Sequence, residues 1–250
     1  MLSFIVPAYN EEVELPATLS AIREAARNLE HEIIVVDDAS TDGTLQIAHA
    51  AHANVISINR RQIAAARNAG GNAAHGNILF FVDADTHITL KHVSGAIAAL
   101  EAGYSGGGAR AVMGGRIPTW SRIFFHVFCT IYFGLNLGAG AFLFTTRKNF
   151  NAIGGFDEKF FIGEEIYFSI ALRTLGQFKI LPEPIVTSGR KLRIYSAREI
   201  LGNSLSVICR GPRAAHSRDG LHIWYDGRRE TRSAFASGQP GSHQRCDQST

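Results

Sequence analysis

The sequence predicts an α/β fold, built on a doubly wound, mostly parallel β-sheet with helices on both of its faces. Short apolar runs alternate with segments whose apolar residues recur at the helical period, which is typical of βαβ units. The unbroken apolar run at 78–82 indicates a strand buried on both faces. With 250 residues, 46% of them hydrophobic, the chain can bury a substantial core.

The first hundred residues account for most of this alternation. Pro16 fits the expected pattern only in the first turn of a helix, where a missing N–H costs nothing. Ser40, Thr41 or Asp42 can cap the helix that follows the second strand. Strands are expected at 2–7, 33–36, 54–58 and 78–82, and helices at about 15–29, 43–51, 62–74 and 89–100.

The spacing changes after Gly103, where turns rich in glycine separate longer elements. The segment from 211 on is expected to be a C-terminal tail, largely disordered from about 226, because it is too polar to bury much apolar surface. The expected elements are strands at 106–117, 138–145, 178–181 and 185–188, and helices at about 120–135, 164–175 and 197–210.

Composition narrows the class of partner and the compartment. A net charge of +3 and a pI near 8.9 suit an anionic small substrate or a membrane surface. Dense Lys/Arg clusters are lacking, which argues against a nucleic-acid partner. The first strand begins at Leu2, which leaves no room for a signal peptide, and three widely spaced cysteines suggest no disulfide framework. We therefore expect a cytoplasmic protein.

One apolar run raises the question of membrane contact. Residues 123–144 carry no acidic or basic side chain apart from His126, and they are numerous enough to span a bilayer. Gly134, Gly138 and Gly140 interrupt the run, so a surface that touches lipid fits it better than a span. Such a contact would place the protein at the cytoplasmic face of the membrane.

Asp83 and Asp85 follow the buried strand at 78–82. Residues two apart in an extended backbone point to the same side, so both carboxylates project together from the strand end. Paired carboxylates suit a hard divalent cation, Mg²⁺ or Mn²⁺, which keeps positions open for diphosphate oxygens. The alternative is that they only end the strand and cap the next helix.

Two further polar clusters follow the first and second strands, at 9–11 and at 37–38. In a doubly wound sheet the carboxyl ends of these strands meet at one edge, where ligands bind. A carboxylate there can accept a hydrogen bond from the ring N–H of a pyrimidine base. Helix capping is the alternative for Asp37 and Asp38.

The turn after the first strand excludes two common nucleotide sites. It reads PAYNEE at 7–12, where a dinucleotide-binding fold requires G-x-G-x-x-G, and the chain contains no P-loop. Phosphate charge must therefore meet a metal or a basic side chain. Arg190, in the run at 188–193, is a candidate for the diphosphate, with a solvated sheet edge as the alternative.

Six motifs, in order, resemble those of family-2 glycosyltransferases with the GT-A fold. They are SFIVPAYNEE at 3–12, VVDDASTDGT at 35–44, ARNAG at 66–70, DAD at 83–85, GGFDE at 154–158 and GEE at 163–165. The resemblance covers about residues 2–190. It implies a nucleotide-diphospho-sugar-binding half at 1–103 and an acceptor-side half of the same domain at 104–210.

The resemblance also implies a function and a set of site residues. It points to metal-dependent transfer of a sugar from a nucleotide-diphospho-sugar to an acceptor hydroxyl of a glycan, lipid or small molecule, usually with inversion. Asp38 would meet the base, Arg67 would lie near the nucleotide, and Asp83 would face the ribose or the metal. Asp85 would be the metal ligand proper. The nucleoside pocket would be lined by Pro7, Ala8, Tyr9 and Glu11.

Inverting transfer also needs a base on the face opposite the leaving diphosphate. Glu164 and Glu165 are the candidates, and the family's base corresponds to the second position, Glu165. The family normally carries Glu-Asp where this chain has Glu-Glu, and the longer side chain moves the oxygens outward by one methylene. Two acids in the first turn of a helix are also common without any catalytic role.

Two other functions compete with this one. A nucleotidyltransferase that makes sugar nucleotides uses a related sheet, but residues 7–12 lack the Gly-rich basic loop that is usual there. A non-catalytic module that binds nucleotide sugars is the other alternative, supported by Glu165 standing in place of Asp.

Overall fold

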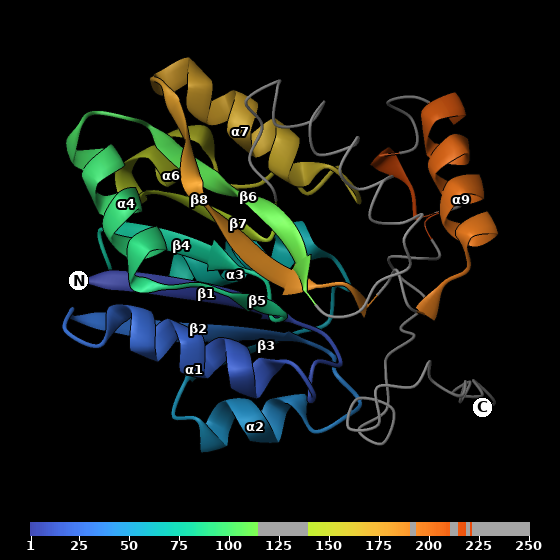
Figure 1. The fold of residues 1–250 in the computed structure, drawn as a ribbon, viewed down its shortest axis with the longest axis horizontal. Helices are drawn as coiled ribbons and strands as arrows, with labels where there is room; N and C mark the ends of the chain where they lie inside the picture. Colours follow the sequence, from blue (N-terminus) through green and yellow to red (C-terminus); the bar gives the residue numbers. More distant parts are fainter. Residues whose placement is uncertain (115–139, 191–193, 211–214, 219–220, 222–250) are drawn as a thin grey trace.

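The computed structural model describes residues 1–114, 140–190, 194–210, 215–218 and 221. Its strands are β1 (Leu2–Ala8), β2 (His31–Asp38), β3 (Asn54–Ile58), β4 (Ile78–Val82), β5 (Thr86–His87), β6 (Gly106–Gly114), β7 (Phe142–Thr146) and β8 (Phe178–Ser188). In this part of the chain they form one sheet in the order β3-β2-β1-β4-β7-β6-β8-β5 (Figure 1).

Helices cover both faces of this sheet. One face packs against α1 (Leu15–Ala26), α2 (Thr44–Ala50) and α4 (Leu90–Glu101), and the other packs against α3 (Ile63–Ala73), α6 (Arg147–Ile153) and α7 (Glu164–Leu175). A further helix, α9 (Ala197–Arg210), stands to the side of the sheet (Figure 1). Among the helices of the described residues, none is both long and apolar enough to span a bilayer.

Alternation along the central strands explains why both faces are buried. Phe4 and Phe80 lie on one face, where their rings stack with centroids 4.8 Å apart. Phe81, the next residue of β4, lies on the other face and meets Phe156 edge-on at 4.9 Å. Because neighbouring residues point to opposite faces, a strand that is covered twice must be apolar throughout.

The pairing pattern places the ends of the first strands together. β1 pairs in parallel with β2 and β4, and β2 pairs in parallel with β3, so their carboxyl ends share one edge. β7 runs antiparallel to both β4 and β6, and β5 runs antiparallel to β8. The predicted α/β fold, a mostly parallel sheet with helices on both faces, is confirmed.

Several details differ from the prediction. The two short strands expected at 178–181 and 185–188 form one strand, β8, whose pairing with β6 shifts register between Ala109 and Ala111. Pro182 and Pro184 lie at this irregularity, because proline cannot donate to the ladder. The short helix α6 and the two-residue strand β5 were not predicted. The expected helix at 120–135 and the tail from 222 lie outside the described residues.

Helix α3 lies close against the sheet at Gly70. A Cβ atom there would lie 2.4 Å from Ile5 Cγ2 and 3.0 Å from Val36 Cγ2. Both side chains are fully buried, so neither can move aside. The glycine of the ARNAG motif is therefore required by packing.

We expect Gly70→Ala to lower the free energy of unfolding by ~1–3 kcal/mol through overpacking. Gly95→Ala is the matched control, since Gly95 is also helical but its added Cβ would make only ordinary contacts, 3.4 Å and 3.7 Å from Leu181. That control should be stabilised by about 0.5–1 kcal/mol, the difference in helix propensity. Urea unfolding of both variants is the measurement, and equal effects would contradict this account of α3.

Candidate functional site

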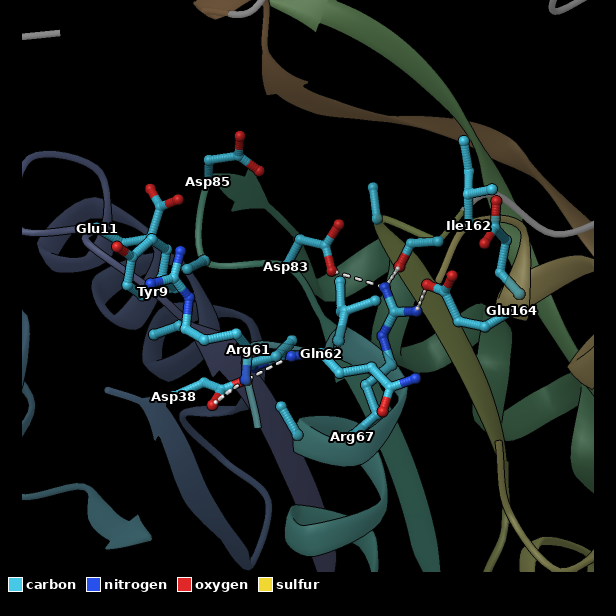
Figure 2. A pocket seen from close by; sticks show the side chains of 18 of the residues that line it. Tyr9, Glu11, Asp38, Arg61, Gln62, Arg67, Asp83, Asp85, Ile162 and Glu164 are labelled. Atoms are coloured by element: carbon cyan, nitrogen blue, oxygen red, sulfur yellow. Dashed lines mark hydrogen bonds and ion pairs between the residues drawn. The ribbon is translucent and has the colours of Figure 1, made fainter. Parts of the chain in front are cut away.

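A cavity of about 380 Å³ opens at the carboxyl ends of β1, β2 and β4, facing the start of α7 (Figure 2). Its walls carry acidic, basic and aromatic side chains together, which is typical of a site for a polar ligand. All the residues predicted for the site line this one cavity: Pro7, Ala8, Tyr9, Glu11, Asp38, Arg67, Asp83, Asp85, Glu164, Glu165 and Arg190. Their position in the lining does not test the roles predicted for them.

The loops after β1 and β2 hold one another in place. Asn10 has a positive φ of 52° and donates its backbone N–H to the Ser40 hydroxyl at 3.0 Å. Its own side-chain oxygen accepts the Thr41 N–H at 2.7 Å. Two residues after Asn10, the Glu12 carboxylate accepts the Gly43 N–H at 2.9 Å. The PAYNEE and DDASTDGT motifs therefore fold as a single interlocked unit.

Asp38 organises a third segment of the cavity wall. Its carboxylate accepts the backbone N–H groups of Arg60, Arg61 and Gln62 at 2.7, 2.8 and 2.7 Å. The turn that precedes α3 is thereby fixed against the end of β2. These N–H groups belong to Gln62, the N-cap residue of α3, and to the two residues before it, so the Asp38 side chain caps neither α2 nor α3 and the capping alternative is wrong for it. The predicted contact between Asp38 and a base stays a prediction.

The same turn directs Arg61 into the cavity. Arg61 has a positive φ of 48°, and its guanidinium carbon lies 3.3 Å from the centroid of the Tyr9 ring. This distance corresponds to close stacking of the guanidinium on the ring. One aromatic wall of the cavity is therefore covered by a cation (Figure 2).

Arg67 is a buried cation that joins the end of β4 to the start of α7. It is 1% exposed, and it donates to Asp83 at 2.9 Å, to Glu164 at 2.7 Å and to the Gly140 carbonyl at 2.8 Å. Burial lowers the pKa of Arg67, but the charges of Asp83 and Glu164 outweigh it, so the net shift is upward. The guanidinium therefore stays charged and holds the start of α7 against the end of β4.

Asn68, which follows Arg67 in the ARNAG motif, holds the GGFDE loop in place. Asn68 donates to the Phe156 carbonyl at 2.8 Å and accepts the Phe156 N–H at 2.8 Å. Gly155, at φ 76°, passes so close that a Cβ atom would lie 2.5 Å from the Asn68 side-chain oxygen. The two motifs are thus physically complementary, and this contact sets the position of the loop that leads to α7.

Glu164 and Glu165 begin α7 but have different surroundings. Glu164 is buried and forms the ion pair with Arg67. Glu165 is partly buried, with its carboxyl carbon near Gly140. Burial and the charge of Glu164 raise the pKa of Glu165 to about 8, although Arg67 opposes the shift. Among the two predicted bases, Glu165 is therefore the one poised to exchange a proton near neutral pH.

A second buried ion pair lies across the cavity. Arg190 is 6% exposed and forms a two-pronged pair with Glu11, with both N–O distances at 2.8 Å. Its guanidinium also lies 3.9 Å from a carboxylate oxygen of Asp85. The alternative of a solvated sheet edge is therefore wrong for Arg190. Lys191 and Arg193 of the same run lie outside the described residues.

Asp83 and Asp85 are the side chains that could hold a divalent cation. They lie in the turn after β4, where the Thr86 N–H donates to the Asp83 carbonyl at 3.0 Å, so the extended backbone expected at 83–85 is wrong. Their side chains are 27% and 21% exposed, and Figure 2 shows both at the same part of the cavity. Within the described residues, no cluster of three His, Cys, Asp or Glu side chains could hold a metal alone. The pair fits a cation that takes its remaining ligands from a bound diphosphate.

The sequence did not indicate several residues of the cavity wall. Arg61 and Gln62 enter it through the backbone contacts of Asp38, and no side-chain pattern marks them. Two others, Ile63 and Ala66, lie in the first turns of α3. The rest contribute from loops whose course depends on the fold: Ala84, Gly140, Ala141, Phe161, Ile162 and Gly163. The available signal was membership of a quoted motif, since Ala66, Ala84 and Gly163 belong to ARNAG, DAD and GEE. Gly163 is the N-cap of α7 and has a φ of 77°, which favours glycine.

Comparison with known proteins gives the family. The model of glycosyl transferase family 2 matches residues 3–180. The chain belongs to this family. The undecaprenyl-phosphate 4-deoxy-4-formamido-L-arabinose transferase of Proteus mirabilis is 32% identical over 118 residues, covering 44% of this chain and 36% of that protein. The chain spans about a third of the length of such curated relatives.

Solved structures show that this family-2 chain has the GT-A fold. A mannosyltransferase from Pyrobaculum calidifontis, in complex with GDP-Man and Mn²⁺, has a TM-score of 0.62 at 20% identity, covering 90% of this chain and 69% of that chain. A glucosyl-3-phosphoglycerate synthase from Mycobacterium tuberculosis, in complex with Mn²⁺, UDP and glucosyl-3-phosphoglycerate, has a TM-score of 0.60 at 20% identity, covering 90% and 80%.

The raised pKa of Glu165 leads to a pH-dependent difference in stability. Between an ordinary pKa of 4.5 and about 8, the folded protein retains a proton that the unfolded chain releases, so stability falls as the pH rises through this window. Glu165→Gln mimics the protonated form. We expect its melting temperature to exceed that of the wild type by an amount that grows from pH 5 to pH 8.

Calorimetric melting at pH 5, 6, 7 and 8 measures this difference, at about 2–4 °C per kcal/mol for a chain of this size. Glu164→Gln is the matched control. It weakens the ion pair of a buried guanidinium, which should lower the melting temperature, and it removes a charge that raises the pKa of Glu165, so its stability should fall less between pH 5 and pH 8 than that of the wild type. A Glu165→Gln difference that is constant with pH would show that Glu165 ionises as an ordinary glutamate.

Proposed function

We propose that this protein is a metal-dependent glycosyltransferase that moves a sugar from a nucleotide-diphospho-sugar to an acceptor hydroxyl, with inversion. The observation that carries the proposal is the shared cavity, which brings Asp83 and Asp85 into one space with Glu165. Membership of family 2 supports it, as do the UDP and GDP-Man complexes of the structural neighbours.

In this proposal the nucleoside lies against the end of β1 and the turn fixed by Asp38. Pro7, Ala8 and Tyr9 form its wall, and Asp38, which lines the same cavity, would meet the base while its oxygens also hold the 60–62 turn. Arg190 brings positive charge to the diphosphate side, where Asp85 lies 3.9 Å from its guanidinium. The Glu11 pair keeps this guanidinium oriented.

Asp85 and Asp83 would hold Mg²⁺ or Mn²⁺, which supplies charge for the departing diphosphate when bound. Glu165 accepts the proton of the acceptor hydroxyl, for which it must first be ionised. The raised pKa makes it a stronger base than an ordinary glutamate, at the cost of a smaller ionised fraction at neutral pH. Glu164 stays with Arg67 and keeps the first turn of α7 in place.

We also propose that the protein is cytoplasmic and that it acts on an acceptor at the inner face of the membrane. Support comes from the relative in Proteus mirabilis, whose name specifies undecaprenyl phosphate. The predicted lipid contact at 123–144 belongs to this proposal, since residues 115–139 lie outside the described part. The nucleotidyltransferase alternative gains no support from the family assignment.

Turnover of UDP- and GDP-sugars, with and without Mn²⁺, tests the proposal. Glu165→Gln should lower kcat about 10²- to 10⁴-fold with little change in donor affinity, the range for loss of a general base. Glu165→Asp, which restores the residue usual in the family, should keep measurable activity. Asp85→Asn should abolish the metal dependence together with the activity.

Glu101→Gln is the control for loss of a carboxylate, because Glu101 is exposed at the end of α4, away from the cavity lining. Its kinetics should match the wild type. Metal-dependent turnover that survives Asp85→Asn unchanged would refute the assigned metal site. Nucleotide binding without turnover of any donor would favour the non-catalytic module instead.

A further inference from the structure

Residues 215–218, here called the strap, contact both walls of the cavity although they lie beyond the segment matched by the family model. The Phe161 N–H donates to the Ala215 carbonyl at 2.6 Å. At the other end of the strap, the Arg218 guanidinium donates to the carbonyls of Arg60 and Arg61, the latter at 2.8 Å. Its guanidinium carbon also lies 5.2 Å from the Phe161 ring centroid.

On the side of the proposed nucleotide, the strap binds the turn at 60–62 through backbone carbonyls. Asp38 accepts the N–H groups of this turn and Arg218 donates to its carbonyls, so both kinds of backbone group in the turn are held by side chains. The turn needs such support because Arg61 has a φ of 48°, a conformation that is unfavourable for a residue with a side chain. The part of this turn that faces the cavity is the Arg61 guanidinium, which stacks on the Tyr9 ring.

On the acceptor side, the strap contacts the loop that leads into α7. Phe161, Ile162 and Gly163 line the cavity immediately before the two glutamates. The ring of His216 packs against Phe160 at 4.7 Å, which adds a second contact between the strap and this loop. The strap therefore connects the wall that carries Tyr9 with the first turn of the helix that carries Glu165.

We propose that Arg218 is a positioning residue for the nucleotide pocket. By holding the carbonyls of the 60–62 turn, it fixes the wall formed by Arg61 and Tyr9, and this makes donor affinity depend on the strap. Arg218 contacts the turn and the Phe161 ring, and it acts on the ligand through Arg61. The inference rests on the proposed function, because it assigns that wall to a nucleoside diphosphate.

The test is calorimetric titration of the full chain with UDP and with GDP in the presence of Mn²⁺. Arg218→Ala should weaken binding of the nucleotide that the wild type prefers by about 3- to 10-fold, the loss of one or two solvent-exposed hydrogen bonds. Arg218→Lys should bind the nucleotide with an affinity between those of the wild type and Arg218→Ala, since one ammonium group cannot reproduce the planar guanidinium. Arg198→Ala, an exposed arginine on α9, should bind as the wild type does.

A purely structural role would lower stability without this pattern, so melting temperatures are measured in parallel. We expect Arg218→Ala to melt within about 2 °C of the wild type, a shift below 1 kcal/mol. The kcat at saturating donor should be unchanged while the donor KM rises. Equal losses in kcat and stability would overturn the positioning role.

A double-mutant cycle with Arg61→Ala tests the path of the effect. If Arg218 acts through the turn, its substitution should cost little further affinity once the Arg61 side chain is absent, whereas independent contributions would add. Additive losses would overturn the inference. Arg218→Ala binding as tightly as the wild type would overturn it while leaving the proposed function intact, and a wild type that binds neither nucleotide would overturn both.

Discussion

The arrangement of the cavity depends on one buried cation. Arg67 joins Asp83 at the end of β4 to Glu164 at the start of α7, and it also binds the Gly140 carbonyl just before β7. A guanidinium removed from water needs its charge balanced, and here two carboxylates do this while both terminal nitrogens donate; the buried Nε is the one nitrogen of this group without a hydrogen-bond partner among the described residues. The relative position of α7 and β4 is therefore fixed by electrostatics as well as by the phenylalanines packed beneath them.

The buried arginines divide several acids of the site into two groups: acids that compensate an arginine, and Glu165. Asp83 and Glu164 compensate Arg67, while Glu11 compensates Arg190. Glu165 has a raised pKa because it is buried and lies beside the charge of Glu164, and these two effects outweigh the opposing charge of Arg67. The two adjacent glutamates are chemically distinct in the folded protein, although nothing in a Glu-Glu pair on its own would separate them.

The sequence was sufficient to predict most of the strands and helices and the gathering of acids at one sheet edge. Those inferences rely on local periodicity and on the rule that parallel strands end together. The partners of Arg67 and Arg190 could not be predicted in this way. Glu164 is 97 residues from Arg67, and Glu11 is 179 residues from Arg190, so both pairs depend on the tertiary fold. The Arg61 wall was missed because backbone N–H groups leave no trace in side-chain patterns.

The interlocked loops after β1 and β2 have a thermodynamic consequence. Asn10, Ser40 and Thr41 already satisfy one another, and so do Glu12 and Gly43, before any ligand arrives. A ligand that binds between these loops meets a backbone that is already ordered. Little of its binding free energy is therefore lost in ordering the backbone. Selectivity on this side of the cavity then depends on the preformed shape of the backbone, and the side chains make any adjustment to the ligand.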